Sequence, residues 1–322
     1  MSMIEERSKK VILNHRFFFM GIAILMVILY HIYCVFSDIS VLRLFRRGYI
    51  GVDIFFFFSG FGLCFSYLRN PLLLFYKNRL LRIMPLYWIW AFIHVIVIYI
   101  DTKSYPTLLD LFGIGTTLSY YGIGSIRSNW YLSALMCLYL LFPILFYFIK
   151  QKGWYFLIFC LALTAILLYK IPFHWYHSAF VGRIYIFLFG IMAYQYIVNK
   201  KHVNHTLFMV TSIITLLGFV FLHYSEHFQF WSTSCICPLI ILLLSLVPHK
   251  ILNNSFITLC GQYSLEIFIA NCWVMLLMQY CNMGTIFKML LYFVCNSIFA
   301  FLLSLINSRI STFLGAKLIY NK

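Results

Sequence analysis

Two ionisable residues inside apolar stretches, His31 and Asp53, are the first candidates for chemistry. Such side chains are costly in an apolar segment and tend to face a cavity or a partner. An imidazole suits a general base, and a carboxylate beside it orients the ring and stabilises its protonated form. The alternative is a buried polar pair that only fixes two helices against each other.

A basic cluster, Lys77, Arg79 and Arg82, is the second candidate. In a helix Arg79 and Arg82 share a face because they are three positions apart. Guanidinium groups match the oxygens of a phosphate, so the cluster could bind a phosphorylated ligand. It could equally be an anchor that contacts lipid headgroups.

The elements that position these residues are predicted to be membrane-spanning helices. Apolar residues make up 63% of the chain and charged residues 10%, which is more apolar surface than a soluble core of this size can bury. About ten apolar runs are long enough to cross a bilayer as helices. These runs are 17–36, 49–68, 84–100, 131–149, 154–169, 181–198, 207–223, 231–247, 263–280 and 286–306. We therefore expect an all-α, polytopic transmembrane helical bundle that forms one domain over residues 1–322, with no fused soluble domain.

The distribution of basic residues predicts the orientation of this bundle. With the N-terminus inside the cell, about 16 of the 24 Lys and Arg residues fall on the cytoplasmic side, which favours two cytoplasmic termini. His31 then lies near the outer end of the first helix and Asp53 near the outer start of the second. The two side chains are expected at similar depth, whereas the basic cluster faces the cytoplasm.

Other partners are less well supported. The net charge of +16 comes from residues spread between apolar runs, which favours contacts with membrane lipids over nucleic acid. The H-x-x-E-H pattern at 223–227 is found in some zinc proteases. It falls at a helix end with no protease domain around it, so no metal is expected.

Several segments carry a family resemblance in their order and spacing. Three of these segments contain the candidate site residues: Leu29-Tyr30-His31, Gly51-Val52-Asp53 and Phe75-Tyr76-x-x-Arg79. The full set of matching segments is 21–31, 51–61, 75–88, 130–143, 183–190 and 261–266. Together they make the chain resemble the acyltransferase-3 family of bacterial membrane acyltransferases, which acylate cell-surface glycans.

The resemblance implies a reaction and assigns residues to it. An acyl group, commonly acetyl from acetyl-CoA, would pass to a hydroxyl of a cell-surface or lipid-linked glycan at the inner membrane. His31 matches the essential histidine of the family and would be the general base, with Asp53 beside it. The residues expected to bind acyl-CoA are Arg79, Arg82, Arg16 and Tyr76, and those expected to contact the acceptor are Trp130, Arg183, Asn271 and Glu266.

Two positions depart from the family pattern. Met20 stands eleven positions before His31, where the family usually has an arginine, and Arg16 lies one turn further back on the same face. Asn271 stands where many members have a histidine, and an amide can form hydrogen bonds but cannot take up a proton. These changes would fit an altered donor, an altered acceptor or a catalytically inactive relative.

A different class of function stays open beside acyl transfer. His31, His94, Asp53 and Glu266 could form the proton relay of a transporter or flippase for a small or lipid-linked molecule. Whichever function holds, the Gly-rich connection 101–130 is expected to form a re-entrant or gating loop. If the protein is an acyltransferase without a fused outer domain, it acts on the acceptor directly or supplies a separate extracytoplasmic transferase.

Overall fold

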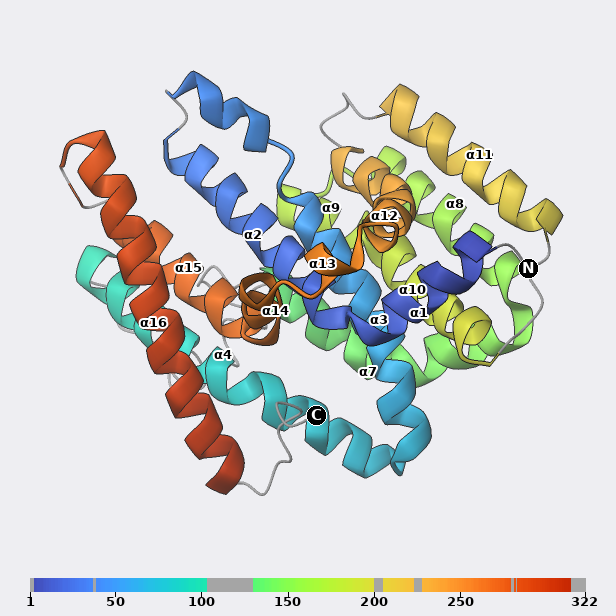
Figure 1. The fold of residues 1–322 in the computed structure, drawn as a ribbon, viewed down its shortest axis with the longest axis horizontal. Coiled ribbons are helices and arrows are strands. Elements are labelled where there is room, and N and C mark those ends of the chain that lie inside the picture. Colours follow the sequence, from blue (N-terminus) through green and yellow to red (C-terminus); the bar gives the residue numbers. More distant parts are fainter. Residues whose placement is uncertain are drawn as a thin grey trace. The chain divides into compact units, whose positions relative to one another are not determined.

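The computed structural model describes residues 3–36, 39–102, 130–199, 205–222, 228–278, 281 and 283–313. All regular elements within these ranges are helices, so the all-α prediction is confirmed (Figure 1). Most of the 101–130 connection and the whole H-x-x-E-H pattern at 223–227 lie outside the described residues.

Each of the ten predicted apolar runs falls on a helix. These helices are α2 (Arg16–Val35), α3 (Ile50–Arg69), α4 (Leu72–Thr102), α7 (Trp130–Lys152), α8 (Trp154–Lys170), α10 (Ile184–Ile197), α11 (His205–Leu222), α12 (Gln229–Ser245), α15 (Ser264–Met278) and α16 (Thr285–Phe313). Within the described residues, five helical segments are long and apolar enough to cross a membrane, and shorter apolar helices accompany them. The chain is therefore a polytopic integral membrane protein, while the exact number of spans stays a prediction.

The remaining helices are short, and one of them joins the charged N-terminus to the bundle. They are α1 (Met3–Asn14), η1 (Ser40–Phe45), α9 (Trp175–Val181), α13 (His249–Leu252) and α14 (Ser255–Gln262). Arg7 of α1 donates hydrogen bonds from Nη2 to the carbonyl oxygens of Leu246 and Val247, at 3.2 and 3.0 Å. A cation is favourable there because the last carbonyls of a helix carry partial negative charge. Arg7 therefore caps the C-terminal end of α12.

The chain divides into two compact units. The first comprises Met1–Val27, Arg47–Pro71 and Leu140–Gly261. Its centre is the contact of α3 with α10, where a Cβ atom added at Gly60 would lie 2.1 Å from the carbonyl oxygen of Phe187. A Cβ atom at Gly190 would lie 2.2 Å from the carbonyl oxygen of Phe57. Glycine at both positions lets the two backbones touch, as small residues do in membrane helix pairs.

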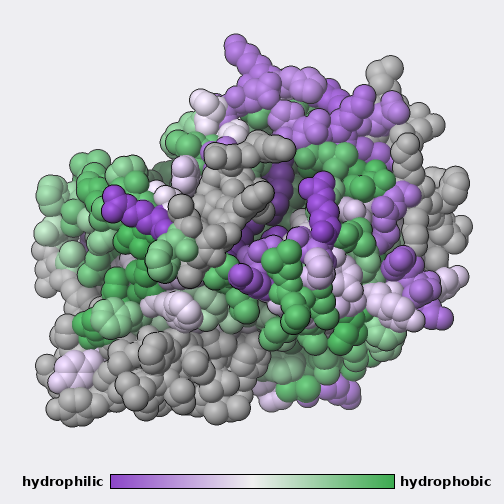
Figure 2. Space-filling view, turned by 90° about the horizontal axis from the view of Figure 1, so that it is seen from below, coloured by the Kyte–Doolittle hydropathy of each residue, from purple (hydrophilic) through white to green (hydrophobic). Residues whose placement is uncertain are grey.

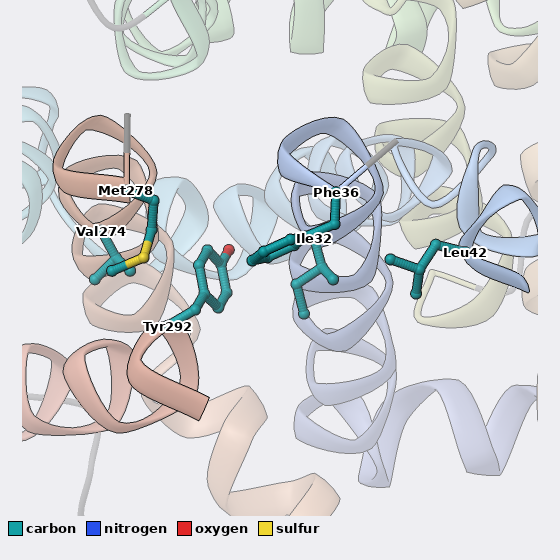
Figure 3. Close-up of a cluster of buried hydrophobic side chains, with 6 residues drawn as sticks. All are labelled: Ile32, Phe36, Leu42, Val274, Met278 and Tyr292. Carbon is teal, nitrogen blue, oxygen red and sulfur yellow. The ribbon is translucent and has the colours of Figure 1, made fainter. Parts of the chain in front are cut away.

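The second unit comprises Ile28–Arg46, Leu72–Tyr139 and Gln262–Lys322. Helices α15 and α16 lie side by side in it, and both contact α4 (Figure 1). An apolar cluster joins the C-terminal part of α2 and the segment after it to this helix pair (Figure 3). Its members are Ile32, Phe36, Leu42, Val274, Met278 and Tyr292. Ile32 follows His31 directly in α2, so the cluster lies next to His31 along the helix.

Figure 2 shows hydrophobic patches (green) on the visible surface, beside hydrophilic areas (purple). On α16 large apolar side chains point outward, with Ile286 79% and Phe301 63% exposed. Such a surface requires lipid around it, because an apolar face of this length is not stable in water.

Candidate functional site

His31 lies on α2, half-buried, and one edge of its ring faces a polar network. Nδ1 of the ring contacts Nδ2 of Asn271 on α15. The hydroxyl of Tyr292 donates to Oδ1 of Asn271, and Nδ2 of Asn296 lies 3.5 Å from the same oxygen. Asn271 and Tyr292 are fully buried, and Asn296 is 5% exposed. On its Nδ1 side, the His31 ring therefore contacts side chains that are buried from water.

Asp53 lies on α3 in the first unit and is fully buried. Its Oδ1 is 3.2 Å from Nε of Arg183, the residue just before α10, and accepts a hydrogen bond of 2.5 Å from Ser234 of α12. Arg183 also donates to the carbonyl oxygens of Ala179 and Tyr49, at 3.1 and 3.3 Å. Within its unit, the carboxylate is thus half of a buried ion pair that ties α3 to α10 and α12.

The predicted pairing of His31 with Asp53 joins residues of different units, since His31 belongs to the second and Asp53 to the first. The structure assigns each of them partners within its own unit. The pairing stays a prediction, and so does the placement of Arg183 at the acceptor.

The basic cluster lies on the first turns of α4, before the apolar segment 84–100. Burial, together with the charge of Arg82, lowers the pKa of Arg79 to about 10. Among the residues that the structure describes, Nε of Arg79 has no hydrogen-bond partner. A desolvated guanidinium group with a donor to spare is suited to an anion, because an anion would restore the interactions that burial removes.

Arg16 lies at the start of α2 and reaches α3. A Cβ atom added at Gly62 would lie 3.1–3.2 Å from the Nη1, Nη2 and Cζ atoms of Arg16. The absence of a side chain at Gly62 therefore makes room for the guanidinium group. This geometry keeps a positive charge beside α3, one helical turn before Met20.

The other predicted site residues are spread over the second unit. Tyr76 lies half-buried beside the ring of Phe75, and Trp130 begins α7 with its ring 6.1 Å from that of Tyr131. Glu266 is 1% exposed, and its Oε1 accepts a hydrogen bond of 2.8 Å from Asn307 of α16. Their predicted roles in binding donor or acceptor stay predictions.

Four further polar residues near these sites did not stand out in the sequence: Tyr292, Asn296, Asn307 and Ser234. Three of them lie on α16, where a polar side chain in an apolar helix is a signal in itself. Asn296 and Asn307 are eleven positions apart, which is close to three helical turns and places both on one face. In the described parts of the chain, no group of three or more His, Cys, Asp or Glu side chains could hold a metal ion.

Fold and site together define an integral membrane protein with buried polar clusters and a desolvated basic group. The family model described as "Acyltransferase domain" matches residues 20–309. The chain therefore belongs to the acyltransferase-3 family and is a membrane acyltransferase. No curated protein and no solved structure matches it.

Proposed function

We propose that the protein transfers an acyl group, with acetyl as the proposed group, from acyl-CoA to a hydroxyl of a cell-surface or lipid-linked glycan. In this reaction an ester C–O bond forms and the C–S bond of the thioester breaks. The proton of the hydroxyl leaves with the CoA thiol, so no further reactant is needed.

The observation that carries the donor assignment is Arg79, half-buried on α4, with a lowered pKa and an Nε that has no hydrogen-bond partner among the described residues. CoA carries several phosphate groups, and bidentate contacts with arginine are a common way to bind them. Arg82 shares the same helix face and would add a second charge.

His31 is the candidate for the reacting site. It is half-buried, and Nδ1 of its ring contacts Nδ2 of Asn271. Which ring nitrogen carries the proton decides whether His31 accepts a proton or donates a hydrogen bond. The sequence predicts a general base, which requires an unprotonated nitrogen facing the acceptor.

The experiment measures acetyl-CoA binding and release of free CoA by purified protein in nanodiscs, with His31→Ala and Arg79→Ala beside the wild type. We expect His31→Ala to lose CoA release but keep binding, and Arg79→Ala to weaken binding. The matched controls are His249→Ala and Arg309→Ala, which remove the same side chains outside the site.

Absence of both binding and CoA release in the wild type would contradict the donor assignment. Binding without release would instead direct attention to the acceptor, and candidate glycans or lipid-linked sugars would then be added. If binding or CoA release fell equally in the variants and in their controls, the decrease would reflect unfolding.

A further inference from the structure

The amide of Asn271 lies between His31 and Tyr292, and its orientation decides which ring nitrogen of His31 carries the proton. All of the residues concerned belong to the second unit, on α2, α15 and α16. An asparagine amide has one acceptor oxygen and two N–H donors, and it can be placed in two orientations that differ by exchange of the two ends. The neighbours must select between them.

Tyr292 makes this selection. Its hydroxyl is fully buried, and Oδ1 of Asn271 is its only acceptor among the described residues. If the amide turned over, an N–H group would face the hydroxyl, and the tyrosine proton would have no acceptor. A buried donor without an acceptor is costly, and such donors are rarer in proteins than unpaired acceptors.

The other end of the amide then faces His31. Nδ2 of Asn271 carries only donors, so the Nδ1 atom that it contacts must be the acceptor. A neutral imidazole with an unprotonated Nδ1 carries its proton on Nε2. The ring therefore presents an N–H group through its remaining nitrogen.

We propose that Asn271, held by Tyr292, is a positioning residue that fixes His31 as the Nε2–H tautomer, and that His31 donates this hydrogen bond to the acyl carbonyl oxygen. The proposal rests on the proposed function and assigns His31 the role opposite to the general base predicted from the sequence. The acceptor hydroxyl attacks the carbonyl carbon, negative charge builds up on the oxygen, and the Nε2–H group stabilises it. As the C–S bond breaks, the hydroxyl proton passes to the CoA thiolate, and His31 keeps its own proton throughout.

The tautomer can be read directly, without turnover. Protein labelled with ¹⁵N-histidine is reconstituted in nanodiscs, and the ring signals of His31 are those that disappear in His31→Gln. We expect a protonated Nε2 and an unprotonated Nδ1 at neutral pH. Asn271→Asp should move the proton to Nδ1, because a carboxylate can only accept.

Val274→Ala is the matched control for a cavity near the site. Val274 is buried one turn along α15, in the same cluster as Ile32 and Tyr292, but it forms no side-chain hydrogen bond. We expect the Nε2–H tautomer to persist in Val274→Ala and to give way to a mixture of tautomers in Tyr292→Phe. A wild-type protein with Nδ1–H, or a Tyr292→Phe variant with an unchanged tautomer, would overturn the proposal.

Kinetics test the hydrogen bond to the carbonyl. Loss of one oxyanion donor lowers kcat by about 10²–10³-fold, which is the loss expected for His31→Ala. His31→Gln should retain part of this rate, since its amide can still donate but cannot act as a base. The kcat of Asn271→Asp should fall toward that of His31→Ala, with little change in KM for acetyl-CoA. The kcat of Val274→Ala should stay near that of the wild type.

The outcomes separate this inference from the proposed function. An equal loss of kcat in His31→Gln and His31→Ala would overturn the proposed hydrogen bond to the carbonyl oxygen. It would favour His31 as the general base. A wild-type protein that neither binds acetyl-CoA nor releases CoA would contradict the proposed function and donation with it. The NMR measurement would still decide the tautomer in that case.

Discussion

Nε of Arg183 lies 3.2 Å from Oδ1 of Asp53, and both side chains are almost completely buried. The guanidinium group also lies over the ring of Phe230, with 4.7 Å between Cζ and the ring centroid. Removal of one partner from a buried pair leaves a charge without compensation. The pair therefore matters to the integrity of the first unit, whatever else Asp53 does.

Either Asp53→Asn or Arg183→Gln should destabilise the protein by about 3–5 kcal/mol, because each leaves one buried charge unpaired. The double variant should be less destabilised than the sum of the two, since it leaves neither charge behind. Thermal unfolding in a mild detergent measures all three. Additive losses would show that the two side chains are not coupled.

The contact of α3 with α10 gives a second prediction. Gly190→Ala would place a Cβ atom 2.2 Å from a backbone oxygen of Phe57, which a rotamer change cannot relieve. Overpacking of this kind costs about 1–3 kcal/mol. The expected result is a lower unfolding temperature in detergent. Gly284→Ala is the control, because a Cβ atom there has nothing within 4 Å.

Donor affinity should depend on pH through Arg79. The pKa of this group is lowered to about 10, so it stays charged at neutral pH and loses its proton as the pH rises through 10. We expect acetyl-CoA to bind with steady affinity below about pH 9 and more weakly above it, as measured by equilibrium dialysis. Arg79→Ala should bind weakly at every pH and lack this alkaline decline. A decline of the same size in Arg79→Ala would assign it to another group.

The orientation of the chain can be tested with its own cysteines. Cys34 is exposed near the predicted outer end of α2, whereas Cys260 is half-buried on α14, on the predicted cytoplasmic side. In variants that keep one cysteine each, an impermeant maleimide should label Cys34 in intact cells and Cys260 only after permeabilisation. Burial raises the pKa of the Cys260 thiol, so its labelling should be slow at neutral pH. Labelling of Cys260 alone in intact cells would reverse the orientation.

The sequence predicted the helices well because each long apolar run has few alternatives to a helix in lipid. It missed α1, which is polar and is held by contacts with α12. It also did not predict that α4 continues from the basic cluster through Pro85 into the apolar segment as one helix, Leu72–Thr102. Loop and helix readings of that stretch have similar local signals in the sequence.

For the candidate site, sequence reasoning found the reactive residue types but not their partners. A buried Asp53 requires a nearby cation. Nothing local in the sequence identifies that cation as Arg183, which is far along the chain. The network of Asn271 with Tyr292 depends on how α15 and α16 align, and apolar helices carry no register signal for that alignment. Partners of this kind come from packing.

The fully buried hydroxyl of Tyr292 also constrains how this chain can evolve. Position 271 cannot change alone, since a new residue there must serve both the tyrosine proton and the imidazole of His31. A histidine at 271, as in many family members, would offer one ring nitrogen to each neighbour. It would therefore change the hydrogen bond with Tyr292 and the hydrogen bond with His31 together. Positions 271, 292 and 296 should therefore vary together among relatives, as a set inherited in common.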